Sequence, residues 1–378
     1  MTNLSAPIEI IRPEAIAFGS GTINAVARFA REKGARRPFV VADAFNAARV
    51  ALLELPGEVT VFGEVKPEPD VPNLDKALAM ARAARPDLVV GFGGGSAMDL
   101  AKLVAVLCTG DQKLAEVVGP DKVASRSVAL VQVPTTSGTG SEGGIRALVT
   151  DPTTRNKLAV QSRFMLADLA VVDPDLTMSV PPQVTAATGV DALAHCTEAL
   201  TSRKAHPSID LYALEGIRLV GRYLNRAVKD GADREARAAL SLASMYGGFC
   251  LGPVNTTAGH AVAYPLGTCH HIAHGLACAV IFPHTLAFNM PAVAAKTEAV
   301  LVALGAPAAK DPAAAFEAAY RFCADLGIEM RLSALGVPED DLGAMADEAH
   351  AIRRLLDNNP REISRDDILA IYQAAMSH

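Results

Sequence analysis

One carboxylate and three imidazoles stand at spacings that a single divalent metal ion could use. Asp191 and His195 are four positions apart, so on a helix both side chains lie on one face. His260 and His274 follow later, and the proline and glycine between them predict a loop or kink that separates two helices. Mixed histidine and carboxylate ligands suit first-row ions such as Fe²⁺, Zn²⁺ or Mn²⁺. An isolated Asp-x-x-x-His pair is more often an ordinary surface or core pair, so the metal hypothesis depends on further segments of the chain.

A glycine-rich turn in the first third of the chain is typical of a phosphate-binding site. The apolar run 88–91 predicts a strand, and three glycines follow it at 93–95. Ser96 and Asp99 then fit a capping box at the start of a helix. Free N–H groups in the first helical turn, together with the helix dipole, favour an anion that the glycines allow to approach closely. Ser96 stands where a G-x-G-x-x-G fingerprint has its third glycine, so a tight turn without a ligand is the alternative.

A second loop combines glycines with hydroxyl side chains. The strand-like run 131–133 leads into Pro-Thr-Thr-Ser-Gly-Thr-Gly-Ser-Glu at 134–142. Such a loop offers several N–H and O–H donors to a ribose or a diphosphate. An ordinary polar loop is the alternative when this segment is considered alone.

Taken together, these segments resemble the iron-containing, group III alcohol dehydrogenases. The resemblance rests on Gly-Gly-Gly-Ser-x-x-Asp-x-Ala-Lys at 93–102, Pro-Thr-Thr-x-Gly-Thr-Gly-Ser-Glu at 134–142 and Gly-Val-Asp-Ala-Leu-Ala-His-Cys-Thr-Glu at 189–198. The correspondence spans nearly the whole chain. It implies a dehydroquinate synthase-like architecture, in which a Rossmann-like α/β domain with a mainly parallel sheet is followed by an all-α domain.

The resemblance also implies a role for each matching position. Asp191, His195, His260 and His274 would bind the catalytic metal, with Fe²⁺ favoured and Zn²⁺ as the alternative. NAD would be the cofactor, bound by Asp43, Gly93, Gly94, Gly95, Ser96, Asp99, Thr135, Thr136, Thr139, Ser141 and Lys157. Within this set the glycines and Ser96 would hold the diphosphate, the hydroxyls at 135–141 would lie along the nicotinamide half, and Lys157 would reach the cofactor.

Asp43 bears on the choice of cofactor. It closes the apolar run 38–43, where relatives place a residue near the adenosine ribose. A carboxylate there can accept hydrogen bonds from a 2′-hydroxyl but would repel a 2′-phosphate, which favours NAD over NADP. Asp43 could equally be the N-cap of a helix, and both roles can coexist.

Tyr264 is a departure from the family pattern. Relatives that act on small diols often have a second histidine four residues after the one that matches His260, and this chain has tyrosine there. Tyrosine can donate a hydrogen bond, but its ordinary pKa of about 10 makes it a poor base at neutral pH. A catalytic role and a place in the pocket wall both remain open for it.

Hydrophobic patterning divides the chain near residue 178. Before this point, short β-rich runs alternate with helical patterns, which predicts a mainly parallel sheet with ligands at the C-terminal strand ends. The predicted strands are 38–43, 59–65, 88–91, 128–133, 147–150 and 169–173, and the first predicted helices after the division are 186–201, 209–229 and 234–251. We therefore expect an α/β dinucleotide-binding domain at 1–178 and an all-helical metal-binding and catalytic domain at 179–378.

The bulk composition excludes several function classes. The chain has 378 residues, enough for two domains with separate cores, and is 50% hydrophobic and 20% charged without a low-complexity tract. A net charge of −6 without a basic cluster argues against nucleic acid as a partner. The first residues lack the features of a signal peptide, and no uncharged apolar run approaches a membrane span. Six cysteines without a C-x-x-C pair suit a reducing compartment, so a cytoplasmic location is expected.

Together with these patterns, the family resemblance implies a metal-dependent NAD(H) oxidoreductase. It would interconvert a small alcohol and its aldehyde or ketone by hydride transfer, and the family suggests a homodimer. Two alternatives on the same scaffold are a hydroxyacid-oxoacid transhydrogenase and a metal- and NAD-dependent enzyme without net redox chemistry. A catalytically silent binding protein is disfavoured because the set of four ligands is intact.

Overall fold

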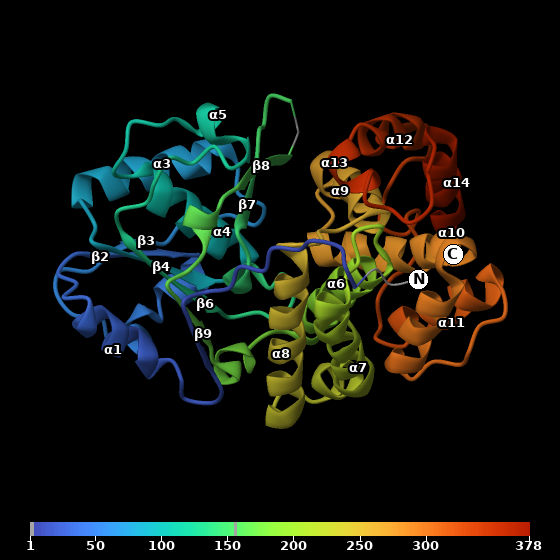
Figure 1. Ribbon diagram of the computed structural model, residues 1–378, viewed down its shortest axis with the longest axis horizontal. Coiled ribbons are helices and arrows are strands. Elements are labelled where there is room, and N and C mark those ends of the chain that lie inside the picture. Colours follow the sequence, from blue (N-terminus) through green and yellow to red (C-terminus); the bar gives the residue numbers. More distant parts are fainter. Residues whose placement is uncertain (1–3, 155–156) are drawn as a thin grey trace. The chain divides into compact units, whose positions relative to one another are not determined.

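The chain divides into two compact units, which are described separately. A computed structural model describes residues 4–154 and 157–378 (Figure 1). The α/β unit contains residues 10–136 and 140–178. The helical unit contains residues 179–378, together with the described part of the first nine residues and the short segment 137–139.

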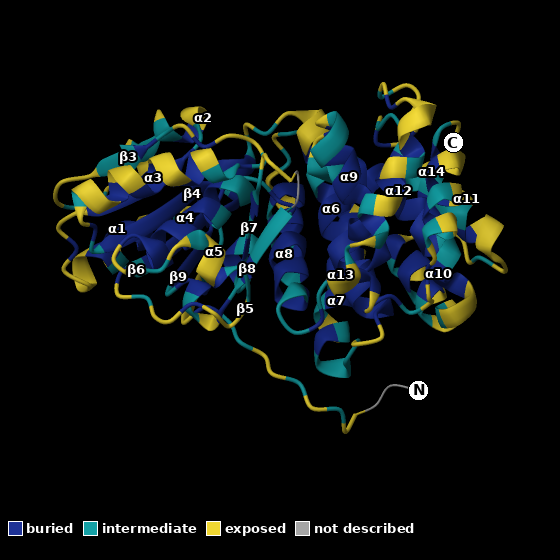
Figure 2. Ribbon diagram, turned by 90° about the horizontal axis from the view of Figure 1, so that it is seen from above, coloured by how far each residue is buried: buried dark blue, intermediate teal, exposed yellow. Residues whose placement is uncertain are grey.

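The α/β unit is built on a six-stranded sheet in which all neighbouring strands run parallel. Its strand order is β1-β9-β6-β4-β2-β3. The strands are β1 (Ala15–Phe18), β2 (Pro38–Ala42), β3 (Thr60–Phe62), β4 (Leu88–Gly93), β6 (Ala129–Pro134) and β9 (Leu169–Val172). All residues of β2 and β4 are buried, as expected of strands in a parallel sheet that is covered on both faces (Figure 2).

Alternate residues of the central strands supply two cores, one on each face of the sheet. Phe39 and Val89 lie in the core that includes buried residues of α3 and α4. Val40 and Val90 lie in the opposite core, which includes buried residues of α1. The α-helices of this unit are α1 (Asn24–Glu32), α2 (Ala44–Ala47), α3 (Val71–Ala84), α4 (Gly95–Leu107) and α5 (Leu114–Val117).

A second, three-stranded sheet completes the α/β unit. Its order is β5-β8-β7, and β7 pairs antiparallel with β8. The strands are β5 (Gly119–Pro120), β7 (Arg146–Thr150) and β8 (Lys157–Gln161). The predicted strand at 147–150 therefore exists as β7, but it lies outside the main parallel sheet to which the alternation of elements assigned it.

The helical unit packs long helices closely against one another. Its α-helices are α6 (Pro182–Thr201), α7 (Pro207–Lys229), α8 (Arg234–Leu251), α9 (Ala258–His270), α10 (His274–Leu304), α11 (Pro312–Ala324), α12 (Leu342–His350), α13 (Arg353–Leu356) and α14 (Arg365–Ala375). Gly189 of α6 lies so close to α7 that a Cβ atom there would stand 2.3 Å from Leu224 Cδ1. Short 3-10 helices occur in both units: η1 (Val50–Leu53), η2 (Ser141–Gly143), η3 (Arg163–Met165), η4 (Pro174–Thr177) and η5 (Glu339–Asp341). This combination of a mainly parallel α/β unit and a helical unit confirms the predicted fold class.

Helix α10 is a core helix of this unit. By length and composition alone it could cross a membrane, but 67% of its most apolar window is buried inside the protein. It contacts α6, α7, α9 and α11. The backbone leaves helical geometry at Val293, two residues after Pro291, so the helix is kinked there.

Candidate metal centre and dinucleotide site

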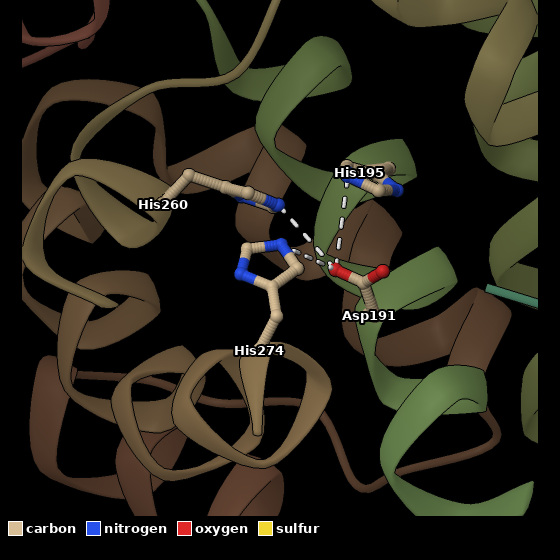
Figure 3. A group of neighbouring side chains, drawn as sticks. All are labelled: Asp191, His195, His260 and His274. Atoms are coloured by element: carbon tan, nitrogen blue, oxygen red, sulfur yellow. Dashed lines mark ion pairs between the residues drawn. The ribbon is translucent and has the colours of Figure 1, made fainter. Parts of the chain in front are cut away.

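Three helices of the helical unit bring the four predicted metal ligands together. Asp191 and His195 lie one turn apart on α6, His260 lies near the start of α9, and His274 is the first residue of α10. Their side chains converge on one point (Figure 3). One ligand atom from each residue lies within 4.8 Å of the corresponding atoms of the other three.

The carboxylate of Asp191 stands at the centre of this cluster. Its Oδ1 atom is 3.7 Å from His195 Nε2, 3.4 Å from His260 Nε2 and 3.6 Å from His274 Nε2. These separations are long for hydrogen bonds. They are close to the roughly 3.4 Å expected between two ligand atoms that bind one ion tetrahedrally at about 2.1 Å.

Burial and missing hydrogen bonds support the same interpretation. Among the residues that the structure describes, neither Asp191 Oδ1 nor His260 Nε2 has a hydrogen-bond partner, although both are buried. Buried polar atoms without partners are costly unless an ion or a water binds them. Burial alone would raise the pKa of Asp191, but the surrounding imidazoles hold it below its ordinary value. Burial also lowers the pKa of His195 to about 4, whereas at His260 and His274 burial is outweighed by Cys278 and neighbouring carboxylates, which raise the pKa of both rings. The residues present fit a divalent metal.

The break between the last two ligands lies elsewhere than the sequence predicted. Helix α9 continues through Pro265 to His270, and the interruption is at 271–273, where His271 adopts a left-handed conformation. The predicted separation into two helices is correct, but its predicted position at the proline is wrong. All residues from 258 to 267 are buried, so tertiary packing holds the helix together despite the hydrogen bond that Pro265 removes.

Two residues to which the sequence analysis assigned no role hold α9 in place. Glu198 of α6 accepts a hydrogen bond from His260, with Oε1 and Nδ1 2.6 Å apart. Asn359 forms a reciprocal amide pair with Asn289 of α10, at 2.7 and 2.9 Å, and accepts a bond from the backbone N–H of Ala258. Glu198 follows His195 by three positions and Asp191 by seven, so the helical spacing of the ligands could have identified it.

Tyr264 lies beside the ligands, one turn after His260. Its ring centroid is 6.4 Å from that of His260 and 5.8 Å from that of His274. The Arg354 guanidinium lies over the tyrosine ring, 5.6 Å from its centroid. Burial opposes ionisation of the phenol, but Arg354 and the neighbouring imidazoles lower its pKa below the ordinary value. Tyr264 is therefore placed for either of the two roles left open by its chemistry.

In the α/β unit, the glycine-rich turn joins β4 to α4. A Cβ atom on Gly93 would lie 2.8 Å from Ala97 Cβ and 3.1 Å from Asp43 Oδ2, so a side chain does not fit there. Gly94 is the N-cap of α4, and no side chain caps this helix. The predicted capping box at Ser96 is therefore wrong. Ser96 Oγ instead accepts a bond from the backbone N–H of Glu68, at 3.2 Å.

Asp43 and the threonines of the second loop gather near this turn. Asp43 caps α2, because its Oδ1 accepts the backbone N–H of Asn46 at 3.0 Å. The side-chain amide of Asn46 donates to Asp43 Oδ2 at 2.6 Å and to Thr135 Oγ1 at 3.3 Å. The Oγ1 atom of Thr136 is 3.3 Å from the position that a Cβ on Gly94 would take.

The remaining predicted cofactor residues enter other contacts. Asp99 accepts bonds from Ser141 Oγ at 2.5 Å and from the backbone N–H of Leu148 at 2.9 Å. Lys157 Nζ pairs with Glu68 Oε2 at 2.7 Å, which links it through Glu68 to Ser96. Thr139 lies in the segment 137–139, which belongs to the helical unit.

Lys102 is a buried lysine that binds the second loop. Its side chain is completely buried in the α/β unit, next to the second loop. Its ammonium donates to Ser141 O at 2.6 Å, to Ser141 Oγ at 2.8 Å and to Arg146 O at 2.8 Å. The sequence contained this lysine in the first motif, but a charged residue that is three positions from an aspartate on a helix usually indicates a surface pair.

Comparison with known proteins identifies the family of this chain. The model of the family "Iron-containing alcohol dehydrogenase" matches residues 13–174, and that of the "Fe-containing alcohol dehydrogenase family, C-terminal" matches residues 185–376. The chain is 36% identical to a long-chain-alcohol dehydrogenase of Geobacillus thermodenitrificans, covering 97% of this chain and 96% of that protein. It is 35% identical to a sulfoacetaldehyde reductase of Bilophila wadsworthia, covering 95% and 96%.

Solved structures show the same likeness. A crystal structure of a 1,3-propanediol oxidoreductase superposes with a TM-score of 0.93 at 31% identity, covering 98% of this chain and 100% of the other. The sulfoacetaldehyde reductase of Bifidobacterium kashiwanohense, in complex with NAD⁺, superposes with a TM-score of 0.88 at 30% identity, covering 99% and 100%. Together with the two family models, these matches confirm the family that the motifs predicted. The chain belongs to the iron-containing alcohol dehydrogenase family, and it is a metal-dependent NAD(H) oxidoreductase of that family.

Proposed function

We propose that Asp191, His195, His260 and His274 hold the divalent metal of an enzyme that interconverts a small alcohol and its aldehyde or ketone. The observation that carries the proposal is the convergence of four ligand atoms within 4.8 Å around a carboxylate oxygen that has no hydrogen-bond partner among the described residues. The family resemblance favours Fe²⁺. Zn²⁺ is the alternative, because it accepts the same histidine and carboxylate ligands.

The protein's own contribution to catalysis is to hold and orient. When bound, a divalent ion supplies Lewis acidity, which polarises a carbonyl oxygen and lowers the pKa of an alcohol. The ligands on α6 and α9 are buried, whereas the His274 side chain is 30% exposed, so we place the substrate on the His274 side of the cluster. Tyr264 borders the same two rings and could donate a hydrogen bond to the substrate oxygen.

We further propose that the glycine turn and the second loop bind NAD. Gly93, Gly94, Gly95 and Ser96 would hold the diphosphate at the uncapped start of α4, where N–H groups and the helix dipole favour an anion. The predicted partners of the remaining cofactor are Asp99, Thr135, Thr136, Thr139, Ser141 and Lys157. Asp43 would accept hydrogen bonds from the adenosine ribose and disfavour a 2′-phosphate.

We also propose a cytoplasmic location and a homodimer. A cytoplasmic location is supported by the six cysteines, which form no disulfide among the described residues and five of which are buried. A homodimer is proposed on the family resemblance alone. The relatives compared above carry names that refer to long-chain alcohols, sulfoacetaldehyde and 1,3-propanediol, so an alcohol or aldehyde group is the shared feature that we carry over to the substrate of this chain.

The test is NADH consumption by protein that is purified without oxygen and loaded in turn with Fe²⁺ and Zn²⁺. NADH absorbance is followed with a panel of aldehydes, ketones and oxo acids. We expect metal-dependent oxidation of NADH with one substrate class. If the protein binds metal and NADH but oxidises no NADH with any compound, the proposal fails in favour of transhydrogenase or non-redox chemistry.

His260→Ala tests the ligand assignment in the same assay. Loss of one of four ligands should abolish metal-dependent turnover, while NADH binding stays largely intact because the cofactor residues are elsewhere in the chain. His350→Ala, at the end of α12, is the matched control and should retain turnover. Unchanged activity of the His260→Ala variant would remove this residue from the ligand set.

A further inference from the structure

Glu198 places a carboxylate in the core of the helical unit, close to the metal ligands. It lies on the same helix as Asp191 and His195, and its side chain is only 8% exposed. Acidic side chains are almost never buried to this degree without partners. Among the described residues, the side chain of Glu198 accepts hydrogen bonds from Thr257, the N-cap of α9, and from His260 in the first turn of that helix.

The two carboxylate oxygens of Glu198 have different hydrogen-bond partners. Oε2 accepts three hydrogen bonds, from Thr257 N at 2.5 Å, Thr257 Oγ1 at 3.0 Å and His260 N at 3.3 Å. Thr257 is the N-cap of α9 and makes no capping bond with its own side chain, so the carboxylate of another helix satisfies these N–H groups instead. Oε1 faces the imidazole of His260, 2.6 Å from Nδ1.

The backbone of α9 is fitted to this carboxylate. A Cβ atom at Gly259 would lie 2.6 Å from Glu198 Oε1 and 2.9 Å from Glu198 Cδ. Any side chain at this position would therefore push the carboxylate away from His260. Glycine inside a helix lowers its stability by about 0.5–1 kcal/mol relative to alanine, so its presence here is explained by the close approach of Glu198.

The contact with Oε1 determines which nitrogen of His260 carries the proton. An ionised carboxylate can only accept hydrogen bonds, so the proton must be on Nδ1. The lone pair of the neutral ring is then on Nε2, which points at the ligand cluster 3.4 Å from Asp191 Oδ1. We infer that Glu198 is a positioning residue for the metal, which fixes the tautomer and orientation of His260 and attaches the start of α9 to α6. This inference rests on the proposed function, because it requires that the cluster binds a metal.

Glu198→Gln is the decisive substitution. It keeps the shape of the side chain but replaces one of the two accepting oxygens by an NH₂ group, which donates hydrogen bonds. The three donors at the Oε2 position require the amide oxygen, so the amide NH₂ must face His260 Nδ1. That nitrogen would then have to accept, and the ring proton would move to Nε2, where it blocks metal binding. We expect metal affinity to fall by about 10- to 100-fold, the usual range for loss of a carboxylate behind a histidine ligand.

Glu198→Ala provides the comparison that separates positioning from packing. It leaves space for a water next to His260 Nδ1, and a water can accept the ring proton and preserve the metal-binding tautomer. The inference therefore predicts that the glutamine variant, although nearly isosteric, loses at least as much metal affinity as the alanine variant. A merely structural role predicts the opposite order, because glutamine retains the volume and most of the contacts.

The measurement is a titration of the metal-free full-length protein with Zn²⁺ or Co²⁺ against a competing chelator, with thermal unfolding of the metal-free form as a control for folding. Glu348→Gln is the matched control, because Glu348 accepts hydrogen bonds from Thr268 and Cys269 at the other end of α9. Its metal affinity should equal that of the wild type. A loss below about threefold in Glu198→Gln, or a smaller loss than in Glu198→Ala, would overturn the inference while leaving the proposed function intact.

If Glu198→Gln does not fold, Gly259→Ala replaces it in the titration, because the added methyl displaces Oε1 while Glu198 stays in the chain. At least about a tenfold loss of affinity is expected from it, and wild-type affinity would overturn the inference. If the wild-type protein itself binds neither metal, the proposed function fails, and that result is distinct from a wild type that binds metal and variants that bind it equally well.

Discussion

Replacing Lys102 by methionine should destabilise the α/β unit and weaken NADH binding. Methionine retains most of the aliphatic chain and removes only the ammonium. The three bonds that Lys102 donates, two to Ser141 and one to the Arg146 carbonyl, would be lost together. Since Ser141 belongs to the loop that we assign to the cofactor, its release from α4 should raise the Kd for NADH.

The size of the effect follows from two opposing contributions. Hydrogen bonds from a charged donor contribute about 1.5–3 kcal/mol each, so the three together contribute roughly 4–9 kcal/mol. Burial of the ammonium, which lowers the pKa of Lys102 to about 8, opposes this by roughly 3 kcal/mol. The free energy of unfolding should therefore fall by about 3 kcal/mol, as it does when one partner is removed from a buried ionic cluster.

Urea unfolding followed by far-ultraviolet circular dichroism measures the stability, and NADH fluorescence measures the binding. The chain has no tryptophan, so NADH must be excited directly. Lys76→Met on the exposed face of α3 is the control and should change stability by no more than about 0.5 kcal/mol. A loss of less than about 1 kcal/mol in Lys102→Met would refute the reasoning, because the three bonds would then be no stronger than bonds to water.

Three other substitutions test separate parts of the structure. Burial raises the pKa of Glu142 from 4.5 to about 7, so folding favours the protonated form of this side chain. As the pH rises from about 4.5 to about 7, the wild type should therefore lose up to roughly 3 kcal/mol of stability relative to Glu142→Gln. Parallel pH profiles of the urea midpoints of the two proteins would disprove this. Gly189→Ala should lower the free energy of unfolding by about 1–3 kcal/mol, because its Cβ would overlap Leu224, and an unchanged melting temperature would show that α6 and α7 can separate freely. Asp43→Ser keeps a residue that can cap α2 but removes the charge, so kcat/KM with NADPH should rise relative to NADH, and an unchanged ratio would exclude Asp43 as the determinant of cofactor choice.

The sequence was most informative where local pattern and burial agree. The strands at the centre of the main sheet are buried on both faces, which gives continuous apolar runs such as 88–91. The helix with Asp191 and His195 was predicted at 186–201 and begins at Pro182, because proline is well accommodated in a first helical turn. The four predicted ligands lie together, each with a ligand atom within 4.8 Å of the others.

The parts that were missed depend on contacts between distant segments. The capping box at Ser96 satisfied a local pattern, but Gly94 is the cap and Asp99 bonds to the loop and to β7 instead. The break predicted at Pro265 gave way to the burial of α9. Glu198 and Lys102 are charged residues within motifs, and only the fold shows that their partners lie tens of residues away.

The attachment of α9 by Asn359 has a consequence for how the enzyme is made. The chain leaves the ribosome N-terminus first. The glycine turn, Asp191 and His195 therefore leave it well before His274, and Asn359 leaves it later still. The start of α9 therefore lacks its link to Asn359 until residue 359 has been synthesised. A metal ion can therefore enter the fully formed site only after residue 359 has left the ribosome, when the α/β unit has long had the opportunity to fold.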